Sequence, residues 1–161
     1  MKRHIHPFIL TFLFFSLTLL LSACMKYGGF SKYQHIAAGG WERSDTISFF
    51  IDTLSQDGTY ELSVGLRMLT VGSYPFKSLS LEVTQTWEKP AVFRCDTLLC
   101  SFYDEENKKK GPGISLQQYK FSLNRMPLSA HSKGKIQVRH VMLRPIIEGI
   151  CDVGVELQAV D

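Results

Sequence analysis

The feature that most restricts the fold of this chain is a strict alternation of apolar and polar residues in its central part. In one segment, apolar side chains occupy every second position: Tyr60, Leu62, Val64, Leu66 and Met68. A period of two places alternate side chains on one face of a β-strand, whereas an α-helix would scatter them around its axis. The pattern therefore predicts a half-buried strand over residues 60–68.

Similar segments recur along the chain, separated by turn signals such as Gln-Asp-Gly at 56–58 and Gly-Pro-Gly at 111–113. They predict strands over residues 46–52, 79–86, 92–103, 117–123, 135–143 and 152–160. No segment of the chain after residue 40 has a convincing helical period. About seven to eight short strands bury their apolar faces by stacking two sheets, so we predict an all-β, antiparallel two-sheet sandwich, Ig-like or jelly-roll-like.

The first residues have the composition of a cleaved export signal. The basic pair Lys2-Arg3 precedes an apolar run over residues 8–21, which is shorter than the roughly 20 residues that a spanning helix needs. The run ends in Leu-Ser-Ala-Cys at 21–24, which is typical of a bacterial lipobox. We therefore expect a lipoprotein signal peptide over residues 1–23, cleavage before Cys24, and a covalent lipid on Cys24 that anchors the protein in a membrane.

The segment that follows is rich in glycine and has no sustained hydrophobic period. We expect residues 24–40 to form the lipidated N-terminus and a flexible tether, and residues 41–161 to form the sandwich, as one domain. Met25 and Lys26 follow the lipobox cysteine, without an acidic run that would direct the protein to the outer surface. This favours the periplasmic face of the outer membrane.

Charge and cysteine content narrow the function further. The chain has 18 Lys and Arg against 15 Asp and Glu, and loss of Lys2-Arg3 with the signal leaves a near balance, so no nucleic-acid partner is expected. Cys95 and Cys100 lie five residues apart in one predicted strand, so they point to opposite faces and cannot bridge each other. Either Cys151 bridges one of them or all three thiols are free.

No residue pattern indicates catalysis or metal binding. The histidines lack the spacing of a zinc site, and no Gly-x-Ser-x-Gly elbow marks a nucleophile. His140 shares a face with Ile136, Val138 and Met142, so we expect a core or interface histidine. The sequence therefore predicts a protein that is not an enzyme, with no metal, no cofactor other than the lipid on Cys24, and no small-molecule substrate.

The candidate interaction surface consists of Arg67 and the turn Tyr74-Pro75-Phe76. Arg67 points away from the apolar face of its strand, and tyrosine and arginine are favoured interface anchors. Alternatively, the aromatic residues cap the sandwich and Arg67 pairs with a strand carboxylate. The basic run at residues 108–110 either meets anionic lipid or forms a solvated loop tip.

The order of several weak motifs resembles the gliding-motility lipoproteins of the GldH type found in Bacteroidetes. The matching residues are Cys24, Trp41, Phe49, Arg67, Tyr74-Pro75-Phe76, Leu79, Asp96-Thr97-Leu98, Lys110-Gly111-Pro112-Gly113 and residues 149–154. The resemblance covers nearly all of the mature chain. It implies a place in the cell envelope and a requirement in gliding, a process tied to the secretion of adhesins, but it carries over no catalytic residue.

Two functions follow as hypotheses. The first is a non-enzymatic, membrane-anchored envelope lipoprotein that supports gliding motility or the linked secretion machinery through protein–protein contacts, made by an exposed sheet edge or a loop end. The alternative is a glycan- or peptide-binding β-sandwich lipoprotein, suggested by aromatic residues that we expect to be exposed, such as Trp41, Trp87 and Tyr74. Fold alone cannot decide between them.

The anchor is tested by replacing the lipobox cysteine. Cys24→Ser removes the thiol that would carry the lipid and leaves the predicted sandwich unchanged, so the variant should fold but leave the membrane fraction. Fractionation with a carbonate wash, followed by a thermal melt of the released protein, measures both effects. Retention of the variant in washed membranes would contradict lipid anchoring.

Overall fold

The computed structural model describes residues 29–70 and 74–160, which contain strands and no helix. Cys24 and the signal segment lie outside the described residues. The strands are β1 (Phe30–His35), β2 (Trp41–Glu42), β3 (Ile47–Ile51), β4 (Gly58–Leu69), β5 (Ser78–Glu88), β6 (Ala91–Ser101), β7 (Leu116–Leu128), β8 (Gly134–His140), β9 (Ile146–Ile147) and β10 (Ile150–Val160). The predicted all-β class is confirmed.

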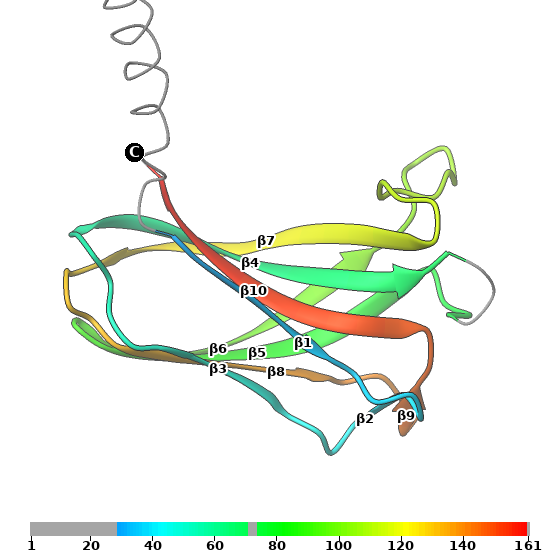
Figure 1. Ribbon diagram of the computed structural model, residues 1–161, viewed down its shortest axis with the longest axis horizontal. Coiled ribbons are helices and arrows are strands. Elements are labelled where there is room, and N and C mark those ends of the chain that lie inside the picture. The colour runs from blue at the N-terminus through cyan, green and yellow to red at the C-terminus, as the bar shows by residue number, and fades with distance from the viewer. Residues whose placement is uncertain (1–28, 71–73, 161) are drawn as a thin grey trace, which may run out of the picture.

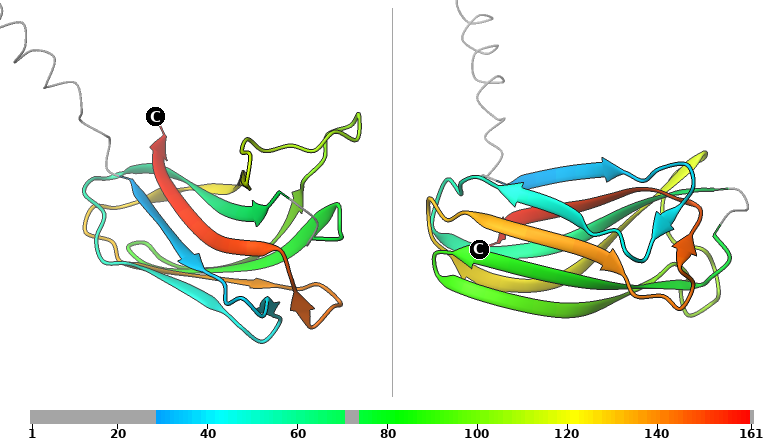
Figure 2. Two further views of the ribbon diagram at one scale, coloured as in Figure 1. Left: turned by 45° about the vertical axis from the view of Figure 1, so that its right-hand side comes forward. Right: turned by 90° about the horizontal axis from the view of Figure 1, so that it is seen from below.

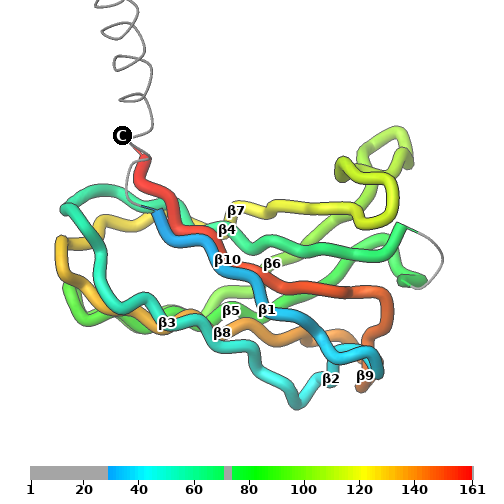
Figure 3. The backbone as a smooth tube through the Cα atoms, viewed as in Figure 1, coloured from blue at the N-terminus to red at the C-terminus, as the bar shows by residue number. Residues whose placement is uncertain are grey.

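The strands form two four-stranded antiparallel sheets and a small two-stranded pair. The first sheet has the order β1-β10-β4-β7, the second has the order β3-β8-β5-β6, and β2 pairs with β9. Pairing is nested, because β5 pairs with β6, β4 with β7, β3 with β8 and β1 with β10. This nesting, which can be traced along the tube in Figure 3, is the order of a jelly roll and not of an immunoglobulin sandwich.

The two sheets lie face to face and enclose one apolar core (Figures 1 and 2). The alternation in β4 is confirmed, since Tyr60, Leu62, Val64, Leu66 and Met68 are all buried. β5 and β8 contribute equally regular inward rows from the opposite sheet. The largest fully buried side chains are Trp41, Tyr60, Phe49, Phe102, Leu62, Leu66, Met68, Leu79, Leu81, Ile136, Ile147 and Leu157.

The predicted flexible tether over residues 24–40 is wrong for residues 30–35. These residues form β1, which pairs with β10 from Phe30↔Leu157 to His35↔Asp152. Periodicity did not indicate a strand because β1 is an edge strand, and its inward positions carry Lys32 and Gln34 beside Phe30. The Gln34 Nε2 group donates a hydrogen bond of 2.6 Å to the Ser48 carbonyl of β3, which satisfies this inward amide.

Other predicted boundaries shift by a few residues. β7 continues beyond residue 123 through Pro127, which an edge strand tolerates because its free side needs no backbone donor. β6 ends at Ser101 and β8 at His140, both earlier than predicted. The segment between the predicted strands 135–143 and 152–160 contains the short strand β9, which pairs with β2.

The three cysteines of the described region are free thiols, so no bridge joins Cys151 to Cys95 or Cys100. Cys95 and Cys100 point to opposite faces of β6, as their spacing predicts: Cys95 is exposed and Cys100 is fully buried. Burial raises the pKa of the Cys100 thiol to about 12 and also raises the pKa of Cys151. Both thiols therefore carry little thiolate at neutral pH, and Cys100 is a residue of the core, whereas Cys151 is half-buried.

An aromatic ring lies flat on the outer face of the first sheet. Tyr33 of β1 covers Gly154 of β10 and Gly65 of β4, which are directly paired. A Cβ atom at either glycine would overlap the Tyr33 ring. Because both positions lack a side chain, the Tyr33 ring packs directly on the backbone of the sheet there.

We predict that Gly65→Ala lowers the free energy of unfolding by about 1–3 kcal/mol, because the added methyl displaces the Tyr33 ring. In a Tyr33→Ser background the same substitution should cost less than about 0.5 kcal/mol. Urea denaturation of the four proteins in this cycle measures the coupling. Gly39→Ala is the control, since a Cβ there contacts nothing within 4 Å, and equal costs in both backgrounds would contradict the packing.

His140 is fully buried next to the indole of Trp41, as expected for a core histidine. The two rings meet edge to face with centroids 5.4 Å apart, and the Nε2–H group of His140 donates to the Trp41 carbonyl at 3.0 Å. Its Nδ1 atom has no partner. Burial lowers the pKa of His140, with a smaller opposing effect of the hydrogen bond, so the ring is neutral at pH 7.

This burial makes stability depend on pH. Below about pH 6.5 the unfolded chain binds a proton on His140 that the folded chain does not bind, so stability is present above that pH and falls below it. The loss is at most about 1.4 kcal/mol per pH unit. Urea denaturation of His140→Gln at pH 7 and pH 5 should show a smaller decrease than the natural chain; equal decreases would contradict this prediction.

Candidate interaction surfaces

The outer face of the second sheet carries a regular arrangement of polar side chains between two aromatic ones. Cross-strand pairing places Phe50, Lys135, Thr86 and Phe93 in one row across β3, β8, β5 and β6. The next row consists of Ser48, Gln137, Thr84 and Cys95, and the third contains Arg139, Glu82 and Thr97. Together, Ser48, Thr84, Thr86, Gln137, Glu82 and Arg139 form what we call the polar floor.

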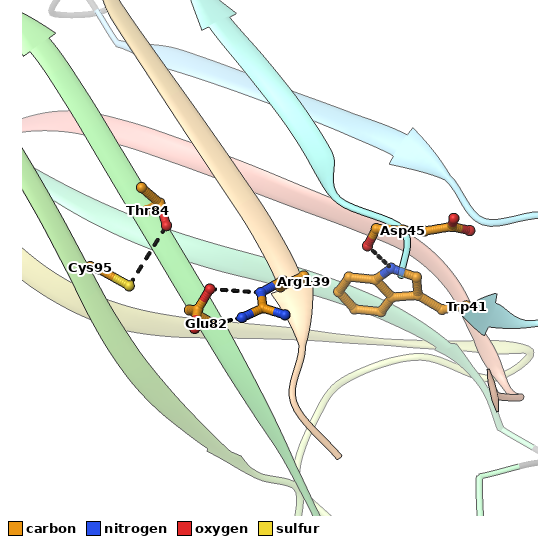
Figure 4. A network of polar contacts seen from close by, with 6 residues as sticks. All are labelled: Trp41, Asp45, Glu82, Thr84, Cys95 and Arg139. Atoms are coloured by element: carbon orange, nitrogen blue, oxygen red, sulfur yellow. Dashed lines mark hydrogen bonds and ion pairs between the residues drawn. The ribbon is translucent and has the colours of Figure 1, made fainter. Parts of the chain in front are cut away.

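An ion pair fixes the third row of this face. Arg139 donates from Nε and an Nη atom to the two carboxylate oxygens of Glu82 at 2.7 and 2.9 Å, so the pair is bidentate (Figure 4). The hydrogen bonds from Arg139 lower the pKa of the Glu82 carboxyl, and the same contact raises the pKa of Arg139. Both groups stay charged at neutral pH and neutralise each other.

The other polar side chains of this face make only weak contacts within the chain. Gln137 Nε2 donates to the Ser48 hydroxyl at 3.4 Å, and the Thr84 hydroxyl lies 3.7 Å from the Cys95 sulfur (Figure 4). Phe50 and Phe93 are 61% and 71% exposed, and the Lys135 ammonium lies 5.6 Å from the centre of the Phe50 ring. The face thus offers hydroxyl, amide and aromatic groups to solvent.

Two shallow hollows lie on this face. One, of about 330 Å³, is lined by Phe50, Ile51, Asp52, Thr86, Glu88, Lys133, Gly134 and Lys135. The other, of about 200 Å³, is lined by Thr46, Glu82, Thr84, Gln137 and Arg139. They follow each other along β8 and β5, since Thr86 borders one and Thr84 the other.

Arg67, predicted as an interaction residue, lies on the outer face of the first sheet and is engaged within the chain. Its guanidinium carbon is 4.0 Å from the centre of the Tyr33 ring, and Nη1 is 3.9 Å from an Asp152 oxygen. The other Asp152 oxygen lies 3.1 Å from the Nδ1 atom of His35. Arg67 thus pairs with a strand carboxylate, the alternative that its position left open.

Tyr74 and Phe76 belong to an aromatic cluster at one end of the sandwich and not to the face that carries Arg67. Tyr74 contacts Phe76 and Phe102 edge to face, at centroid distances of 5.6 and 5.3 Å, and its hydroxyl donates to the Ser78 carbonyl at 2.7 Å. Burial raises the pKa of Tyr74 above its ordinary value. Pro75, which lies between Tyr74 and Phe76 in the sequence, is exposed. These aromatics cap the core.

The expectation of exposed tryptophans is wrong. Trp41 is 1% and Trp87 2% exposed. The Trp41 indole donates to the Asp45 carbonyl at 3.1 Å (Figure 4), and Trp87 packs on Gly134 and donates to the Gln85 side chain at 3.4 Å. The sequence could have predicted the burial of Trp87, because Trp87 continues the alternation of the inward-facing apolar residues of β5.

Exposed apolar side chains concentrate at one end of the sandwich. We call the end with the start of β1 and the end of β10 the near end, and the end with residues 74–77 and the connections 36–46, 102–115 and 141–149 the far end (Figure 1, left and right). Phe50 and Phe93 lie towards the near end. The exposed apolar residues at or beside the far end are Leu69, Leu99, Ile114, Leu116, Val141, Leu143 and Ile146.

The described residues show no cluster of three or more His, Cys, Asp or Glu side chains that could hold a metal ion. Within the same part of the chain, no helix is long and apolar enough to cross a membrane. The basic residues 108–110 lie in the far-end loop, where the Lys108 amide donates to Asp104 Oδ1 at 2.7 Å.

Comparison with solved structures finds chains of low similarity. The Eiger TNF of S. frugiperda is 12% identical, with a TM-score of 0.35 and coverage of 83% of this chain and 94% of that one. A family 35 carbohydrate-binding module of Clostridium thermocellum is 7% identical, with a TM-score of 0.42 and coverage of 82% and 92%. The globular domain of zebrafish complement 1qA is 11% identical, with a TM-score of 0.39 and coverage of 83% and 97%.

These likenesses concern the fold and carry no argument about function. A search of curated proteins finds no match. The family model described as GldH lipoprotein matches residues 29–157, which extend from just before β1 into β10 and include both sheets. The chain therefore belongs to the GldH lipoprotein family.

Proposed function

We propose that this protein is a non-enzymatic lipoprotein, anchored in the cell envelope through Cys24, that supports gliding motility or the linked protein secretion machinery. It does so by binding a partner protein with its far end. The observation that carries the proposal is the concentration of exposed apolar side chains at that end of a domain of the GldH lipoprotein family. Lipidation of Cys24 and binding of a partner protein are both parts of this proposal.

The position of the proposed anchor supports an outward orientation of the far end. Five residues lie between Cys24 and Phe30, the first residue of β1, so these two residues are at most about 20 Å apart in a fully extended chain. β4 has 12 residues and is therefore about 36 Å long. The tether is too short to hold the near end a full strand length from the membrane, so an inverted domain, with its far end against the membrane, is excluded.

The exposed side chains at the far end suit a protein partner. Ile114 and Leu143 are 93% and 95% exposed, a state in which apolar groups gain most from being covered. The β6 edge is a poorer docking element, because β6 carries Arg94 and Asp96 on its inward face. Strand addition beside β6 would bury this charged pair, which protects the edge against pairing.

We predict that Ile114→Ser combined with Leu143→Ser abolishes colony spreading and adhesin secretion when it replaces the natural protein in a gliding host. Both side chains are almost wholly exposed, so the variant should keep its thermal midpoint and its membrane localisation. The expected loss therefore reflects a missing contact and not a missing fold.

The control is Ile114→Val combined with Leu143→Met, which keeps apolar surface at the same two positions. This control should spread and secrete normally. Normal spreading and secretion by the double serine variant would contradict docking through the far end.

A further inference from the structure

We propose that the outer face of the second sheet binds a neutral glycan chain that runs along β8 and β5 over the polar floor. This site lies apart from the far end and goes beyond the proposed docking function. Its first support is the form of the face: two hollows of about 330 and 200 Å³ follow each other along the same two strands. An extended ligand can occupy both.

The groups in the hollows suit a polyhydroxylated ligand. Sugar hydroxyls both donate and accept hydrogen bonds, and the floor supplies the same two capacities through Thr84, Thr86 and the amide of Gln137. The contacts of Gln137 with Ser48 and of Thr84 with Cys95 are long, at 3.4 and 3.7 Å, so their exchange for ligand contacts costs little.

The charges of the hollows favour a ligand without net charge. In the smaller hollow, Arg139 is neutralised by its bidentate contact with Glu82. In the larger hollow, the acidic residues Asp52 and Glu88 balance the basic residues Lys133 and Lys135. An anionic polymer such as a nucleic acid would need an excess of positive charge along this face.

Two exposed aromatic side chains flank the floor in the row of Thr86. Phe50 lies on β3 and Phe93 on β6, so each stands at an outer strand of the sheet with β8 and β5 between them. At 61% and 71% exposure, both rings present apolar surface to a ligand. The C–H faces of sugar rings are apolar and gain by covering such surface.

A peptide strand fits this face less well. Extended peptides bind mainly through backbone hydrogen bonds to a free sheet edge. β8 and β5 are both interior strands whose backbone groups pair on each side. Only side chains are free here, and these are mostly hydroxyls and an amide, together with a self-neutralised ion pair.

The test titrates the mature, isotope-labelled lipoprotein in a detergent without a sugar head group. The probes are cellotetraose, chitotetraose, maltotetraose and xylotetraose, each at millimolar concentration, followed through the backbone amide signals. We expect at least one tetrasaccharide to bind and to shift signals of β5 and β8 around Thr84 and Gln137. Absence of binding by all four, or shifts confined to the far end or the first sheet, would overturn the proposal.

Two variants decide whether the mapped face is the site. Thr84→Lys places a long side chain in the smaller hollow and should weaken binding by about tenfold or more. Ser122→Lys makes the same change at an exposed, outward position of β7 in the first sheet and should leave affinity within about twofold. Phe93→Ser, at a mostly exposed position, gives a second test that does not threaten folding. Full affinity in both Thr84→Lys and Phe93→Ser would overturn the site.

Discussion

The pairing of β1 with β10 determines where the two ends of the described chain lie on the sandwich. It closes the outermost layer of the nested hairpins, and it places the first and last described strands at one sheet edge. Because β1 begins where β10 ends, Cys24, the proposed lipidation site, is only a short chain length from that end of the sandwich. The same register brings Tyr33 over the paired glycines Gly65 and Gly154. The proposed orientation and the packing of Tyr33 thus both depend on one strand pairing.

The two outer faces differ in how far they satisfy their own polar groups. On the first sheet, charged side chains of different strands pair with each other: Lys120 of β7 reaches across β4 to Glu156 of β10 at 2.9 Å, and Arg125 of β7 pairs with Glu61 of β4 at 3.2 Å. Arg67 is held by both Tyr33 and an acidic side chain. The second sheet has one strong ion pair and, besides Lys135, presents hydroxyls, an amide and exposed rings. The first face is therefore internally matched, whereas the second leaves hydrogen-bonding capacity open.

Periodicity predicted the fold well wherever a strand has one buried face. β4, β5, β8 and β10 are recognisable because their inward positions are almost all apolar. β1 was missed because it lies at an edge, where lysine and glutamine occupy inward positions at little cost. The choice between an Ig-like and a jelly-roll order could not be made either, since both have the same local alternation and differ only in which distant strands pair.

The candidate surfaces were predictable only to the extent that they follow from the face on which a residue lies. Alternation alone places Phe50 opposite Phe49 and Ile51 and sends Arg67 outward, and both positions agree with the structure. It does not reveal that Glu82 meets Arg139, because 57 residues separate them and their contact depends on the pairing of β5 with β8. Nor does it distinguish a tryptophan that ends a buried row from one that binds a ligand. Strand parity fixes the direction of a side chain, whereas its neighbours are fixed by the order of the strands, and the functional surfaces depend on those neighbours.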